Sequence, residues 1–157
     1  MELINLSQAT SLVNPLLAEV RDVEVQGDPL RFRRNMERFG ELFAWEIGRR
    51  MPYVDRTVTT PLGTATVPVL REQPVLATIL RAGLPLHQGL LNIFDRADNA
   101  FISAFRKHGG DEAGFEVEIE YMASPTLENR IVVLCDPMLA TGSSMVLAHE
   151  ALLARGR

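Results

Sequence analysis

The sequence contains only one cysteine, Cys135, among its 157 residues. A single cysteine cannot form a disulfide within the chain, nor can it form a zinc site built from cysteines. Structural disulfides are typical of secreted proteins and are rare in the reducing cytosol. The sequence therefore predicts a cytoplasmic protein whose fold depends on its hydrophobic core.

Long hydrophobic runs and an excess of positive charge are also lacking. The apolar stretch at residues 74–80 is far shorter than the roughly 18 residues of a membrane-spanning helix. The first ten residues lack the charged start and apolar run of a signal peptide. The 16 Lys and Arg residues against 20 Asp and Glu give a net charge of −4, which argues against a general nucleic-acid binder. We therefore expect neither a membrane nor a nucleic acid as partner.

What the sequence does have is the composition of a soluble globular domain, with 46% hydrophobic and 23% charged residues. Its length predicts a single domain over residues 1–157. Residues 1–27 have scattered leucines and few turn signals, so we interpret them as an N-terminal arm with a short helix. This arm is expected to dock on the chain or to exchange with a partner subunit.

The remaining residues alternate between helix and strand patterns. Asp28 and Pro29 start a helix that carries an apolar stripe and ends near Met51, before Pro52. Further segments follow in this order: a hairpin at 56–60 and 64–69, a strand at 75–80, a helix at 85–94, a strand at 100–105, a polar loop at 108–114, a hairpin strand at 115–122, a strand at 131–135 and a helix at 143–154. Alternating helices and apolar strands predict an α/β fold with a mainly parallel sheet, β-hairpins outside that pattern and an N-terminal helical arm.

Two basic residues follow predicted strands, where α/β proteins bind their ligands. Arg81 precedes Ala82 and Gly83, and a glycine allows the backbone to approach a ligand closely. Arg106 stands with Lys107 at the end of the next strand. A guanidinium binds phosphate oxygens through two hydrogen bonds, although each arginine taken alone is also compatible with an ordinary surface position.

The strongest signal is the segment from Asp136 to Ser144, which reads Asp-Pro-Met-Leu-Ala-Thr-Gly-Ser-Ser. An apolar strand leads into a carboxylate and then into a small-residue loop that opens a helix. Backbone N–H groups at a helix start, together with hydroxyl groups, form an anion site. The segment is neither a Walker A loop nor a dinucleotide-binding fingerprint, because both of those glycine patterns are missing.

This segment resembles the phosphoribosyl-diphosphate (PRPP) loop of type I phosphoribosyltransferases, in the form found in uracil phosphoribosyltransferases. Most of that superfamily has two adjacent acids, whereas the uracil enzymes, like this chain, have Asp136 followed by Pro137. Residues 79–84 resemble the family's diphosphate-binding loop, and Arg106 resembles its second basic strand end. The resemblance covers residues 70–150, the expected PRPP-binding core, with the three motifs in the family's order.

The resemblance implies the transfer of phosphoribose from PRPP to uracil, giving UMP and diphosphate, in pyrimidine salvage. It assigns Arg81 and Arg106 to the diphosphate and Asp136 to the ribose hydroxyls, as the catalytic set. It implies that the following residues also bind PRPP: Pro137, Met138, Leu139, Ala140, Thr141, Gly142, Ser143 and Ser144. Mg²⁺ is expected as cofactor, held by PRPP oxygens more than by the protein. A homo-oligomer is expected, and GTP activates some members.

Two departures from the family pattern bear on these expectations. Ser143 stands where many members have a second glycine, and serine is small enough to preserve phosphate binding. The family also continues beyond the point that matches Arg157, with the part that binds the uracil ring. We therefore expect the 157-residue chain to lack that part, to bind PRPP weakly and to form UMP poorly by itself.

Two other functions are compatible with the same motifs. One is a PRPP- or nucleotide-binding regulator of the same fold without catalysis, which would require a basic face for RNA. The other is an inactive truncated fragment that folds through contacts between subunits. Uracil-dependent release of diphosphate from PRPP distinguishes the enzyme from both.

Overall fold

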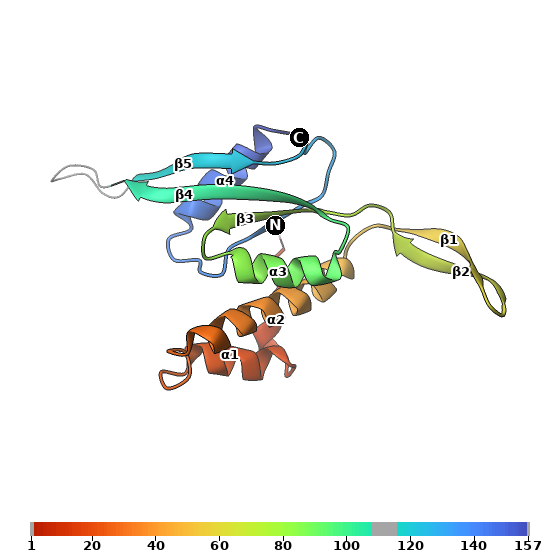
Figure 1. Cartoon of the computed structure of the whole chain (residues 1–157), viewed down its shortest axis with the longest axis horizontal. Helices are drawn as coiled ribbons and strands as arrows, with labels where there is room; N and C mark the ends of the chain where they lie inside the picture. The colour runs from red at the N-terminus through yellow and green to blue at the C-terminus, as the bar shows by residue number, and fades with distance from the viewer. Residues whose placement is uncertain (1, 108–115, 157) are drawn as a thin grey trace.

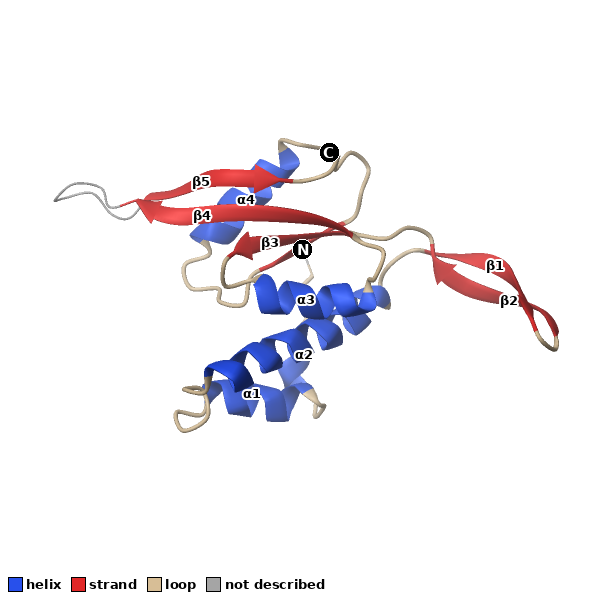
Figure 2. Cartoon of the chain, viewed as in Figure 1, coloured by secondary structure: helices blue, strands red, loops and turns tan. Residues whose placement is uncertain are grey.

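The computed structural model describes residues 2–107 and 116–156, except for the side chains of residues 105–107 and 116–118. Its elements, in chain order, are η1 (Leu6–Gln8), α1 (Val13–Arg21), α2 (Pro29–Gly48), β1 (Tyr53–Thr60), β2 (Gly63–Leu70), β3 (Val75–Leu80), α3 (Leu84–Ile93), β4 (Asp98–Lys107), β5 (Glu116–Ala123), β6 (Val132–Cys135) and α4 (Ser143–Leu153). The expected α/β fold is confirmed (Figures 1 and 2).

The main sheet has the strand order β5-β4-β3-β6. Strand β3 pairs in parallel with both β4 and β6, and β5 pairs antiparallel to β4. Five of the six residues of β3 are buried, as expected for a central strand covered on both faces. Strand β6 is less buried, because among the described residues it pairs only with β3.

Helices cover both faces of this sheet. Helix α4 packs on one face, where Ala148 and Leu152 join Val75, Ala77 and Ile79 of β3 in one buried cluster. Helix α3 covers the opposite face, α2 packs against α3, and α1 packs against α2 (Figure 1). A second cluster fills these helical layers and includes Met36, Phe39, Leu76, Leu86 and Leu90.

Helices α2 and α3 approach each other closely at two glycines. A Cβ atom on Gly89 would lie 1.9 Å from the carbonyl oxygen of Glu37, and one on Gly40 would lie 2.2 Å from the carbonyl oxygen of Leu86. Neither position has room for a side chain. The crossing therefore brings the two backbones together and fixes α3, with the turn that precedes it, against the rest of the molecule.

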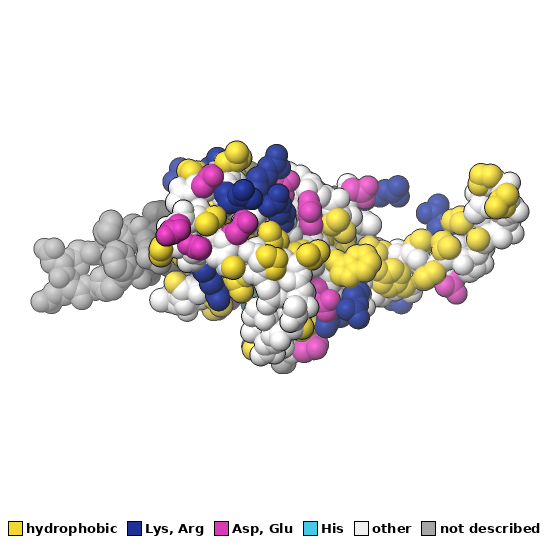
Figure 3. Space-filling model, turned by 90° about the horizontal axis from the view of Figure 1, so that it is seen from below, with side chains coloured by type: hydrophobic (Ala, Val, Ile, Leu, Met, Phe, Trp, Pro, Cys, Tyr) yellow, Lys and Arg dark blue, Asp and Glu magenta, His cyan; other side chains and the backbone are white. Residues whose placement is uncertain are grey.

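Strands β1 and β2 form a separate two-stranded hairpin that projects from the body of the molecule (Figure 1). Most of its side chains are exposed. Hydrophobic side chains gather where the hairpin leaves the body and continue along it (Figure 3). Trp45 near the end of α2 and Tyr53 and Val54 at the start of β1 are all exposed.

Most predicted elements are confirmed, with shifted ends. Asp28 caps α2 by accepting hydrogen bonds from the N–H groups of Leu30 and Arg31. The helix ends at Gly48 instead of near Met51, so the turn before Pro52 is longer than expected. Strand β4 runs beyond its expected end at 105, because its last residues pair with β5. The expected loop at 108–114 lies outside the described residues.

Candidate functional site

The ends of β3 and β6 lie side by side at one edge of the sheet. Thr78 of β3 pairs with Cys135, the last residue of β6. Asp136 therefore leaves the sheet next to the end of β3, and Arg81 follows β3 by one residue. Ligands of open α/β sheets bind outside the carboxyl ends of the strands. The structure thus brings two of the predicted segments together at such an edge.

The turn from β3 into α3 is held against the strand by its own backbone. The N–H of Gly83 donates to the carbonyl oxygen of Ile79 at 3.1 Å. The carbonyl oxygen of Gly83 in turn accepts a hydrogen bond from the N–H of His87 at 2.9 Å. The peptide bond between Leu80 and Arg81 is cis. The Arg81 residue is exposed at this edge.

The loop from β6 into α4 leaves polar groups available at the helix start. Gly142 is the N-cap residue and has a φ of 81°, a conformation that favours glycine. Gly142 itself has no side chain to cap the helix, and the N–H of Ser143, the first residue of α4, donates to Thr141 Oγ1 at 3.4 Å. The Thr141 and Ser143 hydroxyl oxygens lie 2.8 Å apart beside this end. These are the groups from which the sequence predicted an anion site, and the structure places them at one end of the helix.

The first half of the same loop places a carboxylate next to exposed apolar side chains. Asp136 is half-buried, and its Oδ1 accepts a hydrogen bond from the N–H of Met138 at 3.4 Å. Met138 and Leu139 are 73% and 69% exposed. Ala140 is exposed, whereas Pro137 and Ser144 are partly buried. The segment from Asp136 to Ser144 thus forms a surface loop with one anchored carboxylate.

Arg106 is on a different strand from these two loops. It belongs to β4 and pairs with Val117 of β5, three residues beyond Ser103, which is the partner of Leu80 at the end of β3. At about 3.3 Å per residue, its backbone lies about 10 Å past the end of β3. The Arg106 side chain is not among those that the structure describes, so its contact with the site stays a prediction.

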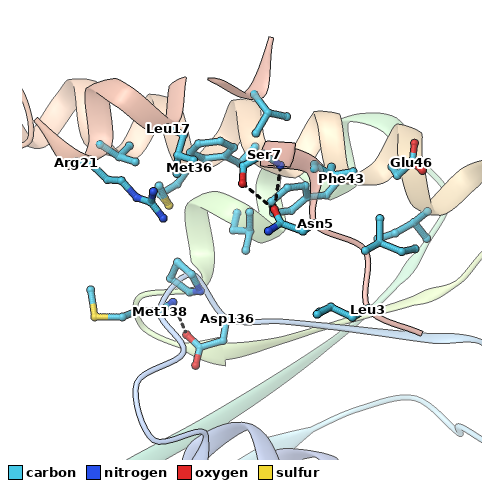
Figure 4. Close-up of a pocket in the computed structure, with 18 of the residues that line it drawn as sticks. Leu3, Asn5, Ser7, Leu17, Arg21, Met36, Phe43, Glu46, Asp136 and Met138 are labelled. Carbon is cyan, nitrogen blue, oxygen red and sulfur yellow. Dashed lines mark hydrogen bonds between the residues drawn. The ribbon is translucent and has the colours of Figure 1, made fainter. Parts of the chain in front are cut away.

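A cavity of about 810 Å³ adjoins the Asp136 loop (Figure 4). Its walls come from the N-terminal arm, α1, α2 and Leu86 of α3, and its floor includes Asp136, Pro137 and Met138. Most of its lining is apolar, with Arg21 and Asn5 among the polar exceptions. This cavity cannot be predicted from the sequence pattern, because the N-terminal arm and the Asp136 loop that line it are more than 100 residues apart in the chain.

Two buried titratable side chains lie behind the site. Burial raises the pKa of the Cys135 thiol, and the neighbouring Thr78 hydroxyl partly offsets that rise. Burial lowers the pKa of His87, which packs against the ring of Phe101 at a centroid distance of 5.3 Å. Both effects favour the neutral forms, so neither group supplies charge to the site.

The donor set fits a magnesium ion that is held mainly by the ligand. Within residues 2–107 and 116–156, no group of three or more His, Cys, Asp and Glu side chains could hold a metal ion. Asp136 is one carboxylate beside the predicted anion site, and Mg²⁺ typically combines one or two carboxylates with substrate phosphates and water.

Among the described helices, none is both long and apolar enough to cross a membrane.

The fold is shared with a solved phosphoribosyltransferase structure. The solved hypoxanthine phosphoribosyltransferase of Staphylococcus aureus shares the fold, with a TM-score of 0.53, 18% identity, and coverage of 78% of this chain and 58% of that one. The structure of the AQ2163 protein from Aquifex aeolicus is more similar, with a TM-score of 0.79, 27% identity, and coverage of 94% of this chain and 68% of that one.

Sequence comparison identifies the family. The family model described as uracil phosphoribosyltransferase matches residues 7–157, and the chain belongs to that family. The uracil phosphoribosyltransferase of Porphyromonas gingivalis is 54% identical over 99% of this chain and 72% of its own length. That of Methanothermobacter thermautotrophicus is 40% identical over 82% of this chain and 60% of its own length.

Proposed function

We propose that this protein transfers phosphoribose from PRPP to uracil, giving UMP and diphosphate in pyrimidine salvage. The observation that supports this most is the convergence of the Arg81 turn and the Asp136–Ser144 loop at the carboxyl ends of adjacent parallel strands. One loop offers a cation and the other a carboxylate and an anion site. PRPP carries a diphosphate, a ribose and a 5′-phosphate, and these groups match that combination.

The Asp136 loop is assigned to the phosphoribosyl part. The N–H groups from Ala140 to Ser144 and the hydroxyls of Thr141, Ser143 and Ser144 hold the 5′-phosphate, because a helix start attracts an anion. The Asp136 carboxylate accepts hydrogen bonds from the ribose hydroxyls. Its contact with the Met138 N–H fixes the turn that presents it. Pro137, Met138 and Leu139, which follow Asp136 in the same loop, are assigned to contacts with the sugar.

The diphosphate is assigned to Arg81 and Arg106. A guanidinium forms paired, charge-assisted hydrogen bonds with phosphate oxygens. Arg81 follows the central strand and is exposed at the same edge as Asp136. Arg106 approaches from β4, further along the strand direction. The two cations stabilise the negative charge that grows on diphosphate as it leaves.

The reaction itself requires little covalent assistance from the protein. The bond between C1 of the ribose and the diphosphate oxygen breaks, positive charge develops on the sugar, and a uracil nitrogen forms the new bond as it loses its proton. The main catalytic contributions of the protein are then to hold the reactants in the correct relative orientation and to stabilise the leaving group. A magnesium ion on PRPP would supply further neutralisation of the diphosphate charge.

The three site segments supply no partners for uracil. Its two carbonyl oxygens and its ring N–H require hydrogen-bonding groups, because a buried polar edge without partners binds poorly. Arg81, Arg106 and the Asp136 loop are all assigned to phosphates or to ribose. We therefore infer that the three site segments provide the PRPP-binding part and that the groups recognising uracil lie outside these segments.

We further infer that the enzyme works in the cytoplasm as a homo-oligomer. The projecting hairpin and the exposed Trp45 and Tyr53 support self-association. GTP as an effector stays a prediction that follows from the family resemblance.

The decisive assay is uracil-dependent release of diphosphate from PRPP in the presence of Mg²⁺. We expect slow but uracil-dependent release from residues 1–157, and calorimetric binding of PRPP. The control is the Porphyromonas gingivalis enzyme under the same conditions. Turnover equal to that enzyme would show that uracil recognition lies within these residues. PRPP binding without any uracil-dependent release would contradict the proposed activity for this chain.

A further inference from the structure

Thr78 is the only polar residue in β3, which reads Val-Leu-Ala-Thr-Ile-Leu. Its side chain is completely buried, with 0% exposure. A central strand that is covered on both faces is normally filled with apolar side chains, and valine has almost the same shape as threonine. The hydroxyl at this position therefore requires an explanation other than packing.

The hydroxyl lies under the turn that carries Arg81. A Cβ atom on Gly83 would lie 2.1 Å from Thr78 Oγ1, so the backbone of Gly83 rests directly on this oxygen. The same turn is closed by the hydrogen bond from the Gly83 N–H to the Ile79 carbonyl oxygen. The Thr78 hydroxyl therefore supports the inner side of the turn and limits how closely it approaches the strand.

The same hydroxyl also lies at the base of the second loop. Thr78 pairs in register with Cys135, which immediately precedes Asp136. The Cys135 side chain is buried on the same face, under α3, and its thiol is close enough to interact with the Thr78 hydroxyl. One buried side chain thus contacts the base of both loops that meet at the site.

This arrangement does not favour the stability of the fold. Thr78 Oγ1 makes no hydrogen bond with a nitrogen or oxygen atom of another described residue, and the neighbouring Cys135 thiol is only a weak partner. A buried hydroxyl without a strong partner costs free energy on folding, whereas an apolar group of similar shape does not. Such a departure from ordinary packing is expected chiefly where function requires it.

We propose that Thr78 is a positioning residue for PRPP, and that its hydroxyl sets the height of the Arg81 turn above β3. The inference rests on the proposed function, because it concerns the site that binds the diphosphate. A methyl group in place of the hydroxyl is larger and would push Gly83, and with it Arg81, away from the strand. The diphosphate would lose its aligned cation, while the 5′-phosphate site at α4 would be unaffected.

The test compares two conservative variants by calorimetry and thermal unfolding. Thr78→Val replaces the hydroxyl with a slightly larger methyl group and keeps the branching at Cβ. We expect a melting temperature close to that of the unsubstituted chain, because removing a poorly paired hydroxyl offsets the cost of fitting the methyl group under Gly83. Binding of PRPP and of diphosphate should weaken about tenfold, as for a lost charge-assisted contact. Binding of ribose 5-phosphate should change less than twofold.

Thr78→Ser is the matched control, because it keeps the hydroxyl and removes a buried methyl. We expect it to lower the melting temperature by about 2–4 °C, as the loss of a small buried group does in a chain of this size. Its affinity for PRPP should stay within twofold of the unsubstituted chain. A purely structural role for Thr78 would instead make affinity follow stability in both variants.

The outcomes separate this inference from the proposed function. If the unsubstituted chain binds no PRPP, the proposed function and this inference both fail. If it binds PRPP and Thr78→Val leaves that affinity unchanged, only the positioning role is wrong. Equal weakening for diphosphate and ribose 5-phosphate in Thr78→Val would also contradict it, because the hydroxyl would then act on the whole site.

Discussion

Asp136 stands at the end of strand β6 and is the residue that we assign to the ribose hydroxyls. The sequence places it after an apolar strand, and the structure places it next to the end of β3, half-buried and anchored to the Met138 N–H. A carboxylate held in this way loses little conformational entropy when it accepts hydrogen bonds from hydroxyl groups. Its role can therefore be tested by removing its charge alone.

Asp136→Asn should weaken PRPP binding about tenfold to a hundredfold, because hydrogen bonds to a charged group contribute about 1.5–3 kcal/mol. The melting temperature should change little, since the side chain is only partly buried. Calorimetry with PRPP measures the loss. Asp95→Asn is the control, because this exposed residue precedes β4 at the opposite edge of the sheet. Unchanged PRPP affinity in Asp136→Asn would overturn the assignment.

Arg81→Gln should reduce the affinity for PRPP and for diphosphate by a similar factor, about tenfold to a hundredfold. Ribose 5-phosphate should bind as before, because it lacks the diphosphate. Competition binding with the three ligands measures this difference, and Arg106→Gln is expected to follow the same pattern. Arg96→Gln, at the opposite edge of the sheet, serves as the control. A loss that is equal for ribose 5-phosphate would show that Arg81 has another function.

Among individual residues, the sequence identified the charged Arg81 and Asp136 but not Thr78, which lies beneath the Arg81 turn. Arg81 and Asp136 follow apolar strands and belong to motifs, so the linear pattern reveals them. Thr78 is read as one more β-branched strand residue, which is how such residues normally behave. Its contact with Gly83 depends on how the chain turns back over β3, and that information is not present in the local sequence.

At the scale of elements, the crossing of α2 and α3 fixes the position of the Arg81 turn. Gly40 and Gly89 let the two backbones touch, and α3 begins immediately after the turn. The helix patterns predicted both helices. They did not predict this contact, because a glycine within a helix pattern normally only weakens that prediction. The contact between α2 and α3 depends on the space that the missing side chains of Gly40 and Gly89 leave free.

Gly89→Ala should destabilise the fold by about 1–3 kcal/mol, the usual cost of overpacking. Its Cβ would lie 1.9 Å from a backbone oxygen of α2, which cannot rotate away. Chemical denaturation measures the free energy of unfolding. Gly48→Ala is the matched control, because a Cβ there meets nothing closer than 4.0 Å and alanine favours a helix. Equal stability of the two variants would contradict the close approach.

At the scale of the whole molecule, the hairpin β1–β2 has little to pack against. An isolated two-stranded hairpin is marginally stable in water at best. Exposed apolar groups at its base, including Trp45 and Tyr53, form a surface of the kind that partners cover (Figure 3). The sequence predicted the hairpin and an oligomer separately. It could not show that the hairpin stands away from the body.

We expect the protein to self-associate through this surface. Light scattering should give a mass of at least two chains, and the double variant Trp45→Ser, Tyr53→Ser should shift that mass toward a single chain. The matched control is Val23→Ser, which changes a residue that is 81% exposed in the connection between α1 and α2. A single-chain mass for the unsubstituted protein would contradict self-association, and an unchanged mass in the double variant would contradict the role of this surface.

The central claim is that PRPP binds where β3 and β6 end. Amide chemical shifts of the whole chain, recorded by NMR during titration with PRPP and Mg²⁺, test it most directly. The largest shifts should fall in residues 80–84 and 136–145, with ribose 5-phosphate affecting only the second group. Saturable shifts concentrated elsewhere, such as in α1 and the N-terminal arm, or no shifts at all, would contradict the account.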